Sequence, residues 1–500
     1  MIERELKLAL PGRFELPPMS IDGAPLIAEP LPELQLRATY HDTDDLRLAR
    51  HGVTLRHRVG DPEGAGWTLK LPRPMERNGV VERDELRFDG DGRDAPAEAR
   101  ALVAAFTRTA PLKPVATLRT RRRRWALLGE QREVLAETAD DEVSVLEGRR
   151  VVARFRELEV ESASDDLNLD ALRDQLTAAG AAAAEPIPKV VRALGSRATA
   201  PPDVVPPALD GDATAADLVA AVIADGFLRI LRNDVLARLG DDEGVHQLRV
   251  ATRRLRSDLR TFEDLVDPGW LEPVQASLRS YGRRLGRVRD LDVLLERLHR
   301  DADGFADRME PVWDDLRRRR EQAHQRLIAG LGEPGWVELL DRLVVGVHHP
   351  PTTDDAASLA ADEGSDRAMR EWDRLADLVD DLEPAAPDAE LHEVRIHAKR
   401  ARYAAEAAAL ALDPPGAADA RRYASALGDI QDLLGTHQDA AVAIVELEAA
   451  AERHAAEPTV VLAIGRLIER QATHAATARR RFPKEWKALR RGRMRKWASR

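Results

Sequence analysis

Acidic side chains recur at every second position in two short segments of the chain. The first segment holds Glu3 and Glu5 and continues in the same rhythm with Lys7, and the second holds Glu157, Glu159 and Glu161. Residues two apart share one face of a β-strand, so both segments predict strands with a carboxylate face. Hard divalent cations prefer carboxylate oxygens, and Mg²⁺ is commonly held by one or two of them together with phosphate oxygens.

Basic side chains follow the same alternation in other predicted strands. Their polar faces hold Arg56 and Arg58, then Lys70, then Arg83, then Arg119 and Arg121, whereas Arg122 and Arg124 are predicted to face outward. A sheet face in water usually mixes charges of both signs, but here the signs are separated from strand to strand. Closing these strands into a barrel would turn the charged faces into a wet lumen and pack the apolar faces against helices.

A lumen with carboxylates on one wall and guanidinium groups on the others suits a polyanion that is bridged by a metal ion. Arginine binds phosphate through its bidentate fork. Phosphoryl transfer needs mainly positioning and charge neutralisation, and a metal ion can also activate the attacking water. The residues on these faces identify no general base.

The chain has 500 residues, no cysteine and a formal net charge of −11. This length is enough for two or more domains, and the lack of cysteine excludes disulfides, thiolate catalysis and cysteine-ligated zinc. Charges at residues 3–7 are incompatible with the apolar part of a signal peptide, and no apolar run has the length of a membrane span. We therefore expect a cytoplasmic protein without membrane contact.

The character of the sequence changes along the chain, which predicts an α+β multidomain fold. Residues 1–196 alternate like β-structure, with helices predicted at residues 95–106 and 169–180. Residues 197–212 are rich in proline and predict a linker. Residues 213–500 have a helical period and predict an all-α domain. Its basic tail from residue 479 either extends an anion contact or is a solvated end.

The helical part repeats itself. The segment "HQLRVATRRLR" at 246–256 aligns with "HEVRIHAKRAR" at 392–402, and "YGRRLGRVRDLD" from Tyr281 aligns with "YASALGDIQDLL" from Tyr423. The shared order predicts a duplication and a two-fold pseudosymmetric bundle.

Each copy carries a cationic stripe on one helix face. The stripes lack acidic residues four positions on, so we prefer an anion-binding groove to a solvated face. A metal site is disfavoured because guanidinium groups repel the ion. The residues predicted to bind the anion are His246, Arg249, Arg253, Arg254, Arg256, His392, Arg395, Lys399, Arg400 and Arg402.

The first domain resembles the CYTH family of triphosphate tunnel metalloenzymes over about residues 1–195. The resemblance is carried by the opening Glu-x-Glu-x-Lys, by "TYHDTDDLRLARHGVTLRHR" at 39–58 and by the order of the later strands. It implies an eight-stranded antiparallel barrel whose members hydrolyse inorganic or thiamine triphosphate or cyclise ATP. It implies Mg²⁺ or Mn²⁺ held by Glu3, Glu5, Glu157 and Glu159, and Asp141, which has the same strand parity as Glu137, is a further predicted ligand. It implies phosphate bound by Lys7, Arg56, Arg58, Lys70, Arg83, Arg119, Arg121 and Lys189.

The segments "VHQLRVATRRLR" and "LHEVRIHAKRARY" resemble the CHAD domain, over about residues 213–480. That resemblance implies binding of inorganic polyphosphate through a basic groove. We therefore predict a metal-dependent triphosphatase that acts on inorganic triphosphate and carries a polyphosphate-binding helical domain. A non-catalytic protein that localises on polyphosphate and an adenylate cyclase are the alternatives. Nucleic acid is disfavoured as a partner because aromatic residues for base stacking are few.

Overall fold

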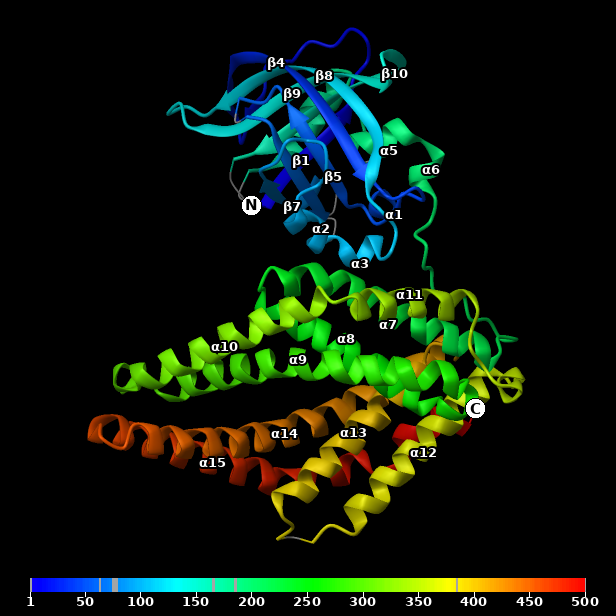
Figure 1. Ribbon diagram of the computed structural model, residues 1–500, viewed down its shortest axis with the longest axis vertical. Coiled ribbons are helices and arrows are strands. Elements are labelled where there is room, and N and C mark those ends of the chain that lie inside the picture. The colour runs from blue at the N-terminus through cyan, green and yellow to red at the C-terminus, as the bar shows by residue number, and fades with distance from the viewer. Residues whose placement is uncertain are drawn as a thin grey trace. The chain divides into compact units, whose positions relative to one another are not determined.

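The computed structural model describes residues 2–62, 64–73, 80–163, 167–183, 187–383 and 385–499 (Figure 1). The chain forms two units, Met1–Asp203 and Val204–Arg500.

Among the residues that the structure describes, eight strands of the first unit form a closed antiparallel barrel, as predicted. Their order around the barrel is β10-β9-β8-β4-β5-β6-β7-β1, and pairing of β1 with β10 closes it. The strands are β1 (Ile2–Ala9), β4 (Ile27–Asp42), β5 (Thr54–Val59), β6 (Gly66–Pro72), β7 (Val80–Phe88), β8 (Lys113–Leu128), β9 (Val134–Glu147) and β10 (Arg150–Ser162). The short strands are β2 (Ser20–Ile21), β3 (Ala24–Pro25) and β11 (Ala182–Ala183), the last of which pairs with β1.

The barrel reverses the usual placement of polar and apolar side chains. On β1 and β10, Leu6, Leu8, Leu158 and Val160 point outward and are buried against helix α4 (Leu169–Ala178). The alternate residues of the same strands are acidic or basic and therefore face the interior. The predicted helix at residues 169–180 is α4, and the one at 95–106 is divided into α2 (Ala97–Leu102) and α3 (Ala104–Thr107).

The chain from residue 189 to 203 packs on the barrel unit. It forms α5 (Lys189–Leu194) and α6 (Ser196–Thr199), and the other short helix of this unit is α1 (Arg47–Arg50). Asp203 forms ion pairs with His51 at 3.2 Å and with Arg108. Burial would raise the pKa of Asp203, but His51 and Arg108 hold it far below its usual range. The first residues of the predicted linker are thus held by buried charges.

The second unit is helical and repeats its own plan (Figure 1). Its helices are α7 (Ala215–Arg238), α8 (Asp242–Thr261), α9 (Pro268–Asp301), α10 (Glu310–Leu331), α11 (Pro334–His348), α12 (Ala360–Asp380), α13 (Asp388–Ala408), α14 (Pro414–Arg453) and α15 (Pro458–Leu489). Short 3₁₀ segments lie at Glu263–Leu265, Ala306–Met309, Asp354–Ala357 and Gly492–Ser499.

The repeated basic segments lie on matching helices. The first basic segment lies on α8 and the second on α13, and each is followed by a long helix, α9 or α14. Both long helices begin with an aspartate cap and a proline, at Asp267 and at Asp413, where the cap accepts a backbone N–H bond. Asp267 and Asp413 are as far apart in sequence as His246 and His392, which supports the duplication.

The basic C-terminal tail is part of the helical core. Trp486 and Trp497 are buried with Trp372 and Tyr423, and the Trp486 ring stacks on Trp372 with 5.2 Å between centroids. Arg495 lies over Trp372, 4.0 Å from the ring centroid. The tail is therefore not a free solvated end, because its tryptophans stabilise the bundle. No helix within the described residues is both long and apolar enough to span a bilayer.

Candidate functional site

The barrel encloses a polar cavity of about 100 Å³ that is open to solvent. Cations dominate its walls. The lining residues are Lys7, Tyr40, Thr54, Arg56, Arg58, Lys70, Arg83, Glu85, Arg87, Arg122, Glu159, Glu161, Pro188 and Lys189.

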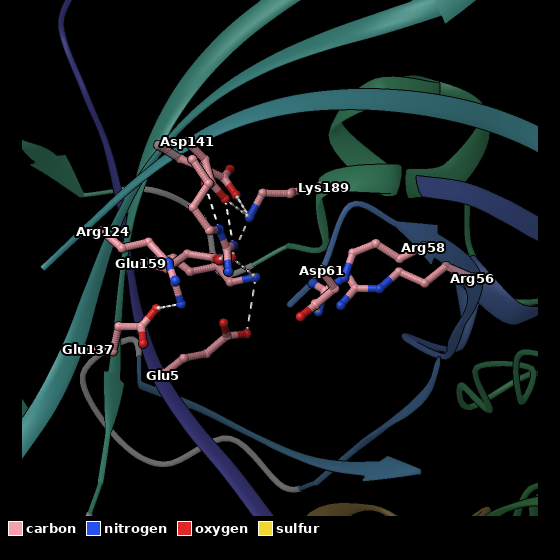
Figure 2. Close-up of polar contacts among 12 residues, drawn as sticks. Glu5, Arg56, Arg58, Asp61, Arg124, Glu137, Asp141, Glu159 and Lys189 are labelled. Carbon is pink, nitrogen blue, oxygen red and sulfur yellow. Dashed lines mark hydrogen bonds and ion pairs between the residues drawn. The ribbon is translucent and has the colours of Figure 1, made fainter. Parts of the chain in front are cut away.

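Lys189 is the centre of an ionic cluster on one wall. Its ammonium lies 2.6 Å from Glu159, 2.7 Å from Glu157 and 3.0 Å from Asp141 (Figure 2). The lysine is the first residue of α5, which explains how a residue distant in sequence reaches the acids of β9 and β10. Arg122 of β8 bonds both Asp141, at 2.7 Å, and Glu159, at 2.6 Å.

These buried charges hold one another in the ionised form. Burial would raise the pKa of Glu159, but Lys189, Lys7 and Arg122 outweigh burial and place this pKa well below its usual range. Burial would lower the pKa of Lys189, but Glu157, Glu159 and Asp141 raise it well above its usual value. Asp141 and Glu157 are buried beside Lys189 and do not line the cavity.

The facing wall holds the basic residues predicted from β5, β6 and β7. Lys70 pairs with Glu85 at 3.0 Å, and Arg58 pairs with Asp61. Burial and the neighbouring Arg56 lower the pKa of Arg58 to about 10. Arg83 is 6% exposed, and within the described residues it forms neither an ion pair nor a hydrogen bond. An incoming anion would relieve the repulsion among these cations.

The predicted orientation of β8 is wrong. Arg122 lines the cavity and Arg124 bonds Glu137 at 3.2 Å, whereas Arg119 and Arg121 are exposed outside it. Arg121 bonds Glu33 at 2.9 Å on the outer surface. The reason is Leu118, which shares a face with Arg122 and is buried against α5 inside the barrel. An apolar residue therefore marks the inner face here, contrary to the rule that applies to β1 and β10.

Two carboxylates converge between β1 and β10. A single nitrogen, Lys7 Nζ, lies 3.1 Å from Glu5 and 3.2 Å from Glu159, so both carboxylates already converge on one cation. Glu5 also lies directly opposite Glu161 in the strand register, and like charges in that position are destabilising without a cation between them. Among the described side chains no three acidic or histidine groups form a ready metal cage, and the side chain of Glu3 lies outside them.

Tyr40 also lines the cavity, although it is not among the residues predicted from the sequence. Its hydroxyl lies 3.4 Å from Arg56 Nη1. Burial would raise the pKa of Tyr40, but Arg56, Lys189 and Lys70 together lower it. The sequence carries a signal for this orientation, because Tyr40 and His41 are neighbours on one strand and must point to opposite faces. His41 packs outside the cavity, edge-on against Trp67, with 4.7 Å between the ring centroids.

In the helical unit, α8 and α13 bring their cationic stripes together. We call Arg249, Arg253, Arg256, Arg395 and Lys399 the basic cluster. Arg253 lies 3.4 Å from the hydroxyl of Tyr403 on α13, which joins the two helices. Within the described residues, Arg249 alone in the cluster has an ion pair, with Asp290 at 2.6 Å. The other four cations have no carboxylate within 4.0 Å among those residues.

The pKa of Lys399 is shifted strongly by its surroundings in the basic cluster. Burial, followed by the charges of Arg253, Arg395, Arg256 and Arg249, lowers its pKa to about 7. The same two causes, burial and nearby cations, lower the pKa of His246 below its usual value. A set of cations that repel one another to this degree is suited to a dense anion.

Three predicted binding residues have partners on the helices around them. Arg254 pairs with Glu406, and Arg402 pairs with the same Glu406 at 2.9 Å. Arg400 lies 3.5 Å from His397 and is influenced by Glu371 of α12. The expectation that the stripes lack acids four residues on was therefore wrong for Arg402. His392 is half-buried on the same helix face as Arg395.

Comparisons with known proteins agree with this two-part architecture. The CYTH domain model matches residues 1–193, and the CHAD domain model matches residues 221–448. The chain is 32% identical over 483 residues to Uncharacterized protein MT2285 of Mycobacterium tuberculosis, an alignment that covers 90% of this chain and 89% of that protein.

Solved structures also resemble parts of the chain. PptA from Streptomyces chartreusis has 24% identity and a TM-score of 0.47, covering 55% of this chain and 100% of that one. The CHAD domain from the plant Ricinus communis has 26% identity and a TM-score of 0.46, covering 57% of this chain and 96% of that one. On the strength of the two domain matches and the full-length relative, the chain belongs to the family of proteins in which a CYTH domain is followed by a CHAD domain.

Proposed function

We propose that the barrel is a metal-dependent triphosphatase that hydrolyses inorganic triphosphate. The observation that carries this proposal is the cavity itself, in which the cations Arg56, Arg58, Arg83 and Lys70 gather opposite the carboxylates Glu159 and Glu161. A neutral or cationic substrate would leave these cations repelling one another, whereas a triphosphate would neutralise them.

Residues of the chain divide the work between binding and positioning. Glu5 and Glu159, with Glu161, would hold Mg²⁺ or Mn²⁺, and Glu3 is a further candidate. The bound metal ion would neutralise phosphate charge and lower the pKa of the attacking water. Arg56, Arg58 and Arg83 would bind the equatorial phosphate oxygens and stabilise the charge that develops on them. Lys189 and Arg122 keep Glu159 ionised and fix its orientation.

The proposal is tested by a phosphate-release assay on a panel of inorganic triphosphate, thiamine triphosphate and ATP, with Mg²⁺ or Mn²⁺ and with EDTA. We expect rapid release from inorganic triphosphate, and no release with EDTA. Formation of cyclic AMP from ATP without triphosphate hydrolysis would identify a cyclase instead. Absence of turnover on the whole panel, together with retained polyphosphate binding, would identify a non-catalytic binding protein.

We also propose that the basic cluster of the helical unit binds inorganic polyphosphate. Four of its cations lack a carboxylate partner among the described residues, and two helices contribute to it. A linear polyanion would supply the missing negative charge along both helices, as the phosphate backbone of a nucleic acid does for the proteins that bind it.

Affinity for polyphosphate is expected to increase as the pH falls. Lys399, with its pKa of about 7, is largely neutral above that pH and charged below it, and a bound polyanion raises the pKa and favours the charged form. Between about pH 8 and about pH 6 the dissociation constant should fall about tenfold. Titration calorimetry at several pH values measures this change. Lys399→Arg, which stays charged, should flatten the profile, and an unchanged profile in that variant would contradict the assignment.

A further inference from the structure

Tyr403 joins the two helices that carry the basic cluster. The residue belongs to α13 and is 3% exposed, and its hydroxyl accepts a hydrogen bond from Arg253 Nη2 of α8 at 3.4 Å. The acceptor is neutral, so the bond orients the guanidinium group without balancing its charge. Arg253 therefore keeps its full attraction for an anion while one of its nitrogens is held from the opposite helix.

Two arginines that the sequence predicts to bind the anion lie over the ring of Tyr403. The guanidinium carbon of Arg254 is 5.4 Å from the ring centroid and that of Arg402 is 5.9 Å from it, distances at which a cation is attracted to an aromatic ring. Glu406, on the next turn of α13, accepts hydrogen bonds from both, at 2.9 Å from Arg402 Nε and through its other oxygen from Arg254. Their charge is thus balanced by Glu406, and their position fixes the ring.

This arrangement crosses from α8 to α13 at two neighbouring residues. Arg253 bonds Tyr403, and the next residue, Arg254, bonds Glu406. Arg254 also lies 3.5 Å from Asp258, which is 4% exposed. Long side chains lose rotamer freedom when they bind a ligand, and this cost is smaller where the folded protein has already ordered them.

The first copy of the duplicated segment contains no equivalent of this tyrosine. When the alignment of the two copies is continued along both helices, Tyr403 corresponds to Ser257 and Glu406 to Arg260. A serine has no ring over which arginines can lie. Lys399, which corresponds to Arg253, is therefore not held in this way by its counterpart on α8.

We propose that Tyr403 is a positioning residue for polyphosphate binding, which holds the guanidinium group of Arg253 toward the anion. This inference rests on the proposed binding of polyphosphate by the basic cluster. Within the described residues, Arg253 has no carboxylate partner, so its other N–H groups can donate to phosphate oxygens. Arg254 and Arg402 act on the anion only through Tyr403, because Glu406 balances their charge.

The test is a cycle of single and double variants of the full chain, in which fluorescence anisotropy measures the dissociation constant for labelled long-chain polyphosphate. Tyr403→Phe removes only the hydroxyl, and we expect it to weaken binding about fivefold with little change in unfolding temperature. Arg253→Met removes the charge and every donor of that side chain. In the Arg253→Met background, Tyr403→Phe should have no additional effect, because the hydroxyl acts through Arg253.

Two control variants should bind polyphosphate as the wild type does. Tyr281→Phe removes the hydroxyl of another buried tyrosine that has an arginine, Arg284, over its ring, and Ser257→Ala changes the matching position on α8. An equal loss from Tyr403→Phe in both backgrounds would assign the hydroxyl to packing of the two helices and overturn this inference alone, as would wild-type affinity in Tyr403→Phe. Failure of the wild-type chain to bind polyphosphate would overturn the proposed binding as well.

Discussion

Replacing Glu5 with glutamine should reduce triphosphate hydrolysis on the order of 100-fold while leaving the fold intact. Glu5 is 3% exposed, and its charge is shared with Lys7 at 3.1 Å. Glutamine keeps the shape of the side chain but removes the negative charge that would hold a divalent cation. Affinity for Mn²⁺, measured by titration calorimetry, should fall together with turnover, and thermal unfolding should change little.

The matched control for Glu5→Gln is Glu147→Gln, since Glu147 is an exposed carboxylate at the end of β9. The control should leave hydrolysis and Mn²⁺ affinity unchanged. Wild-type turnover of Glu5→Gln at a low Mg²⁺ concentration would show that the metal lies elsewhere in the barrel. A loss of turnover with unchanged Mn²⁺ affinity would assign Glu5 to positioning Lys7 instead.

Charge reversal of both Arg253 and Lys399 should abolish binding of long-chain polyphosphate, with a loss on the order of 1000-fold at low salt. The two residues occupy matching places on α8 and α13, and Arg253 contributes to the lowered pKa of Lys399. Two glutamates would place negative charge at the centre of the basic cluster. Fluorescence anisotropy with labelled polyphosphate at several salt concentrations measures the loss, and the wild-type affinity should fall steeply with salt.

Two comparisons show whether the loss comes from the basic cluster. Hydrolysis of short triphosphate should be unchanged in Arg253→Glu/Lys399→Glu, because that site lies in the barrel. Lys487→Glu on α15 is the matched control and should weaken binding only slightly. Wild-type affinity in the double variant would show that the stripes do not bind the polyanion.

A neutral replacement separates a binding role from a structural one. Burial and neighbouring cations disfavour the charged form of Lys399 in the folded protein, which lowers its pKa relative to the unfolded chain. Its charge therefore destabilises the fold increasingly as the pH falls from the unfolded pKa to about 7. Lys399→Met should raise the unfolding temperature at neutral pH while weakening polyphosphate binding. A lower unfolding temperature would indicate that Lys399 stabilises the bundle.

The alternation of charged and apolar residues was sufficient to predict the inner faces of β1, β5, β6 and β10. Glu5, Lys7, Arg56, Lys70 and Glu159 all lie inside the barrel because leucine, tryptophan or valine alternates with them and must be buried outside. The two-residue period therefore predicts which face points into the barrel wherever the other face of the strand is apolar. In the same way, the helical period alone predicts the cationic stripes on α8 and α13.

Strand β8 contains no such signal, since four arginines follow one another at 121–124. Which of them face the lumen depends on Leu118, and Leu118 is inside because α5, from a distant part of the chain, packs against it there. The position of Lys189 among three carboxylates and the pairing of Arg254 and Arg402 with one glutamate, Glu406, have the same origin. Local sequence determined which residues are charged and which faces they share, and tertiary packing decided which charges meet, because ion pairing depends on distances between segments far apart in sequence.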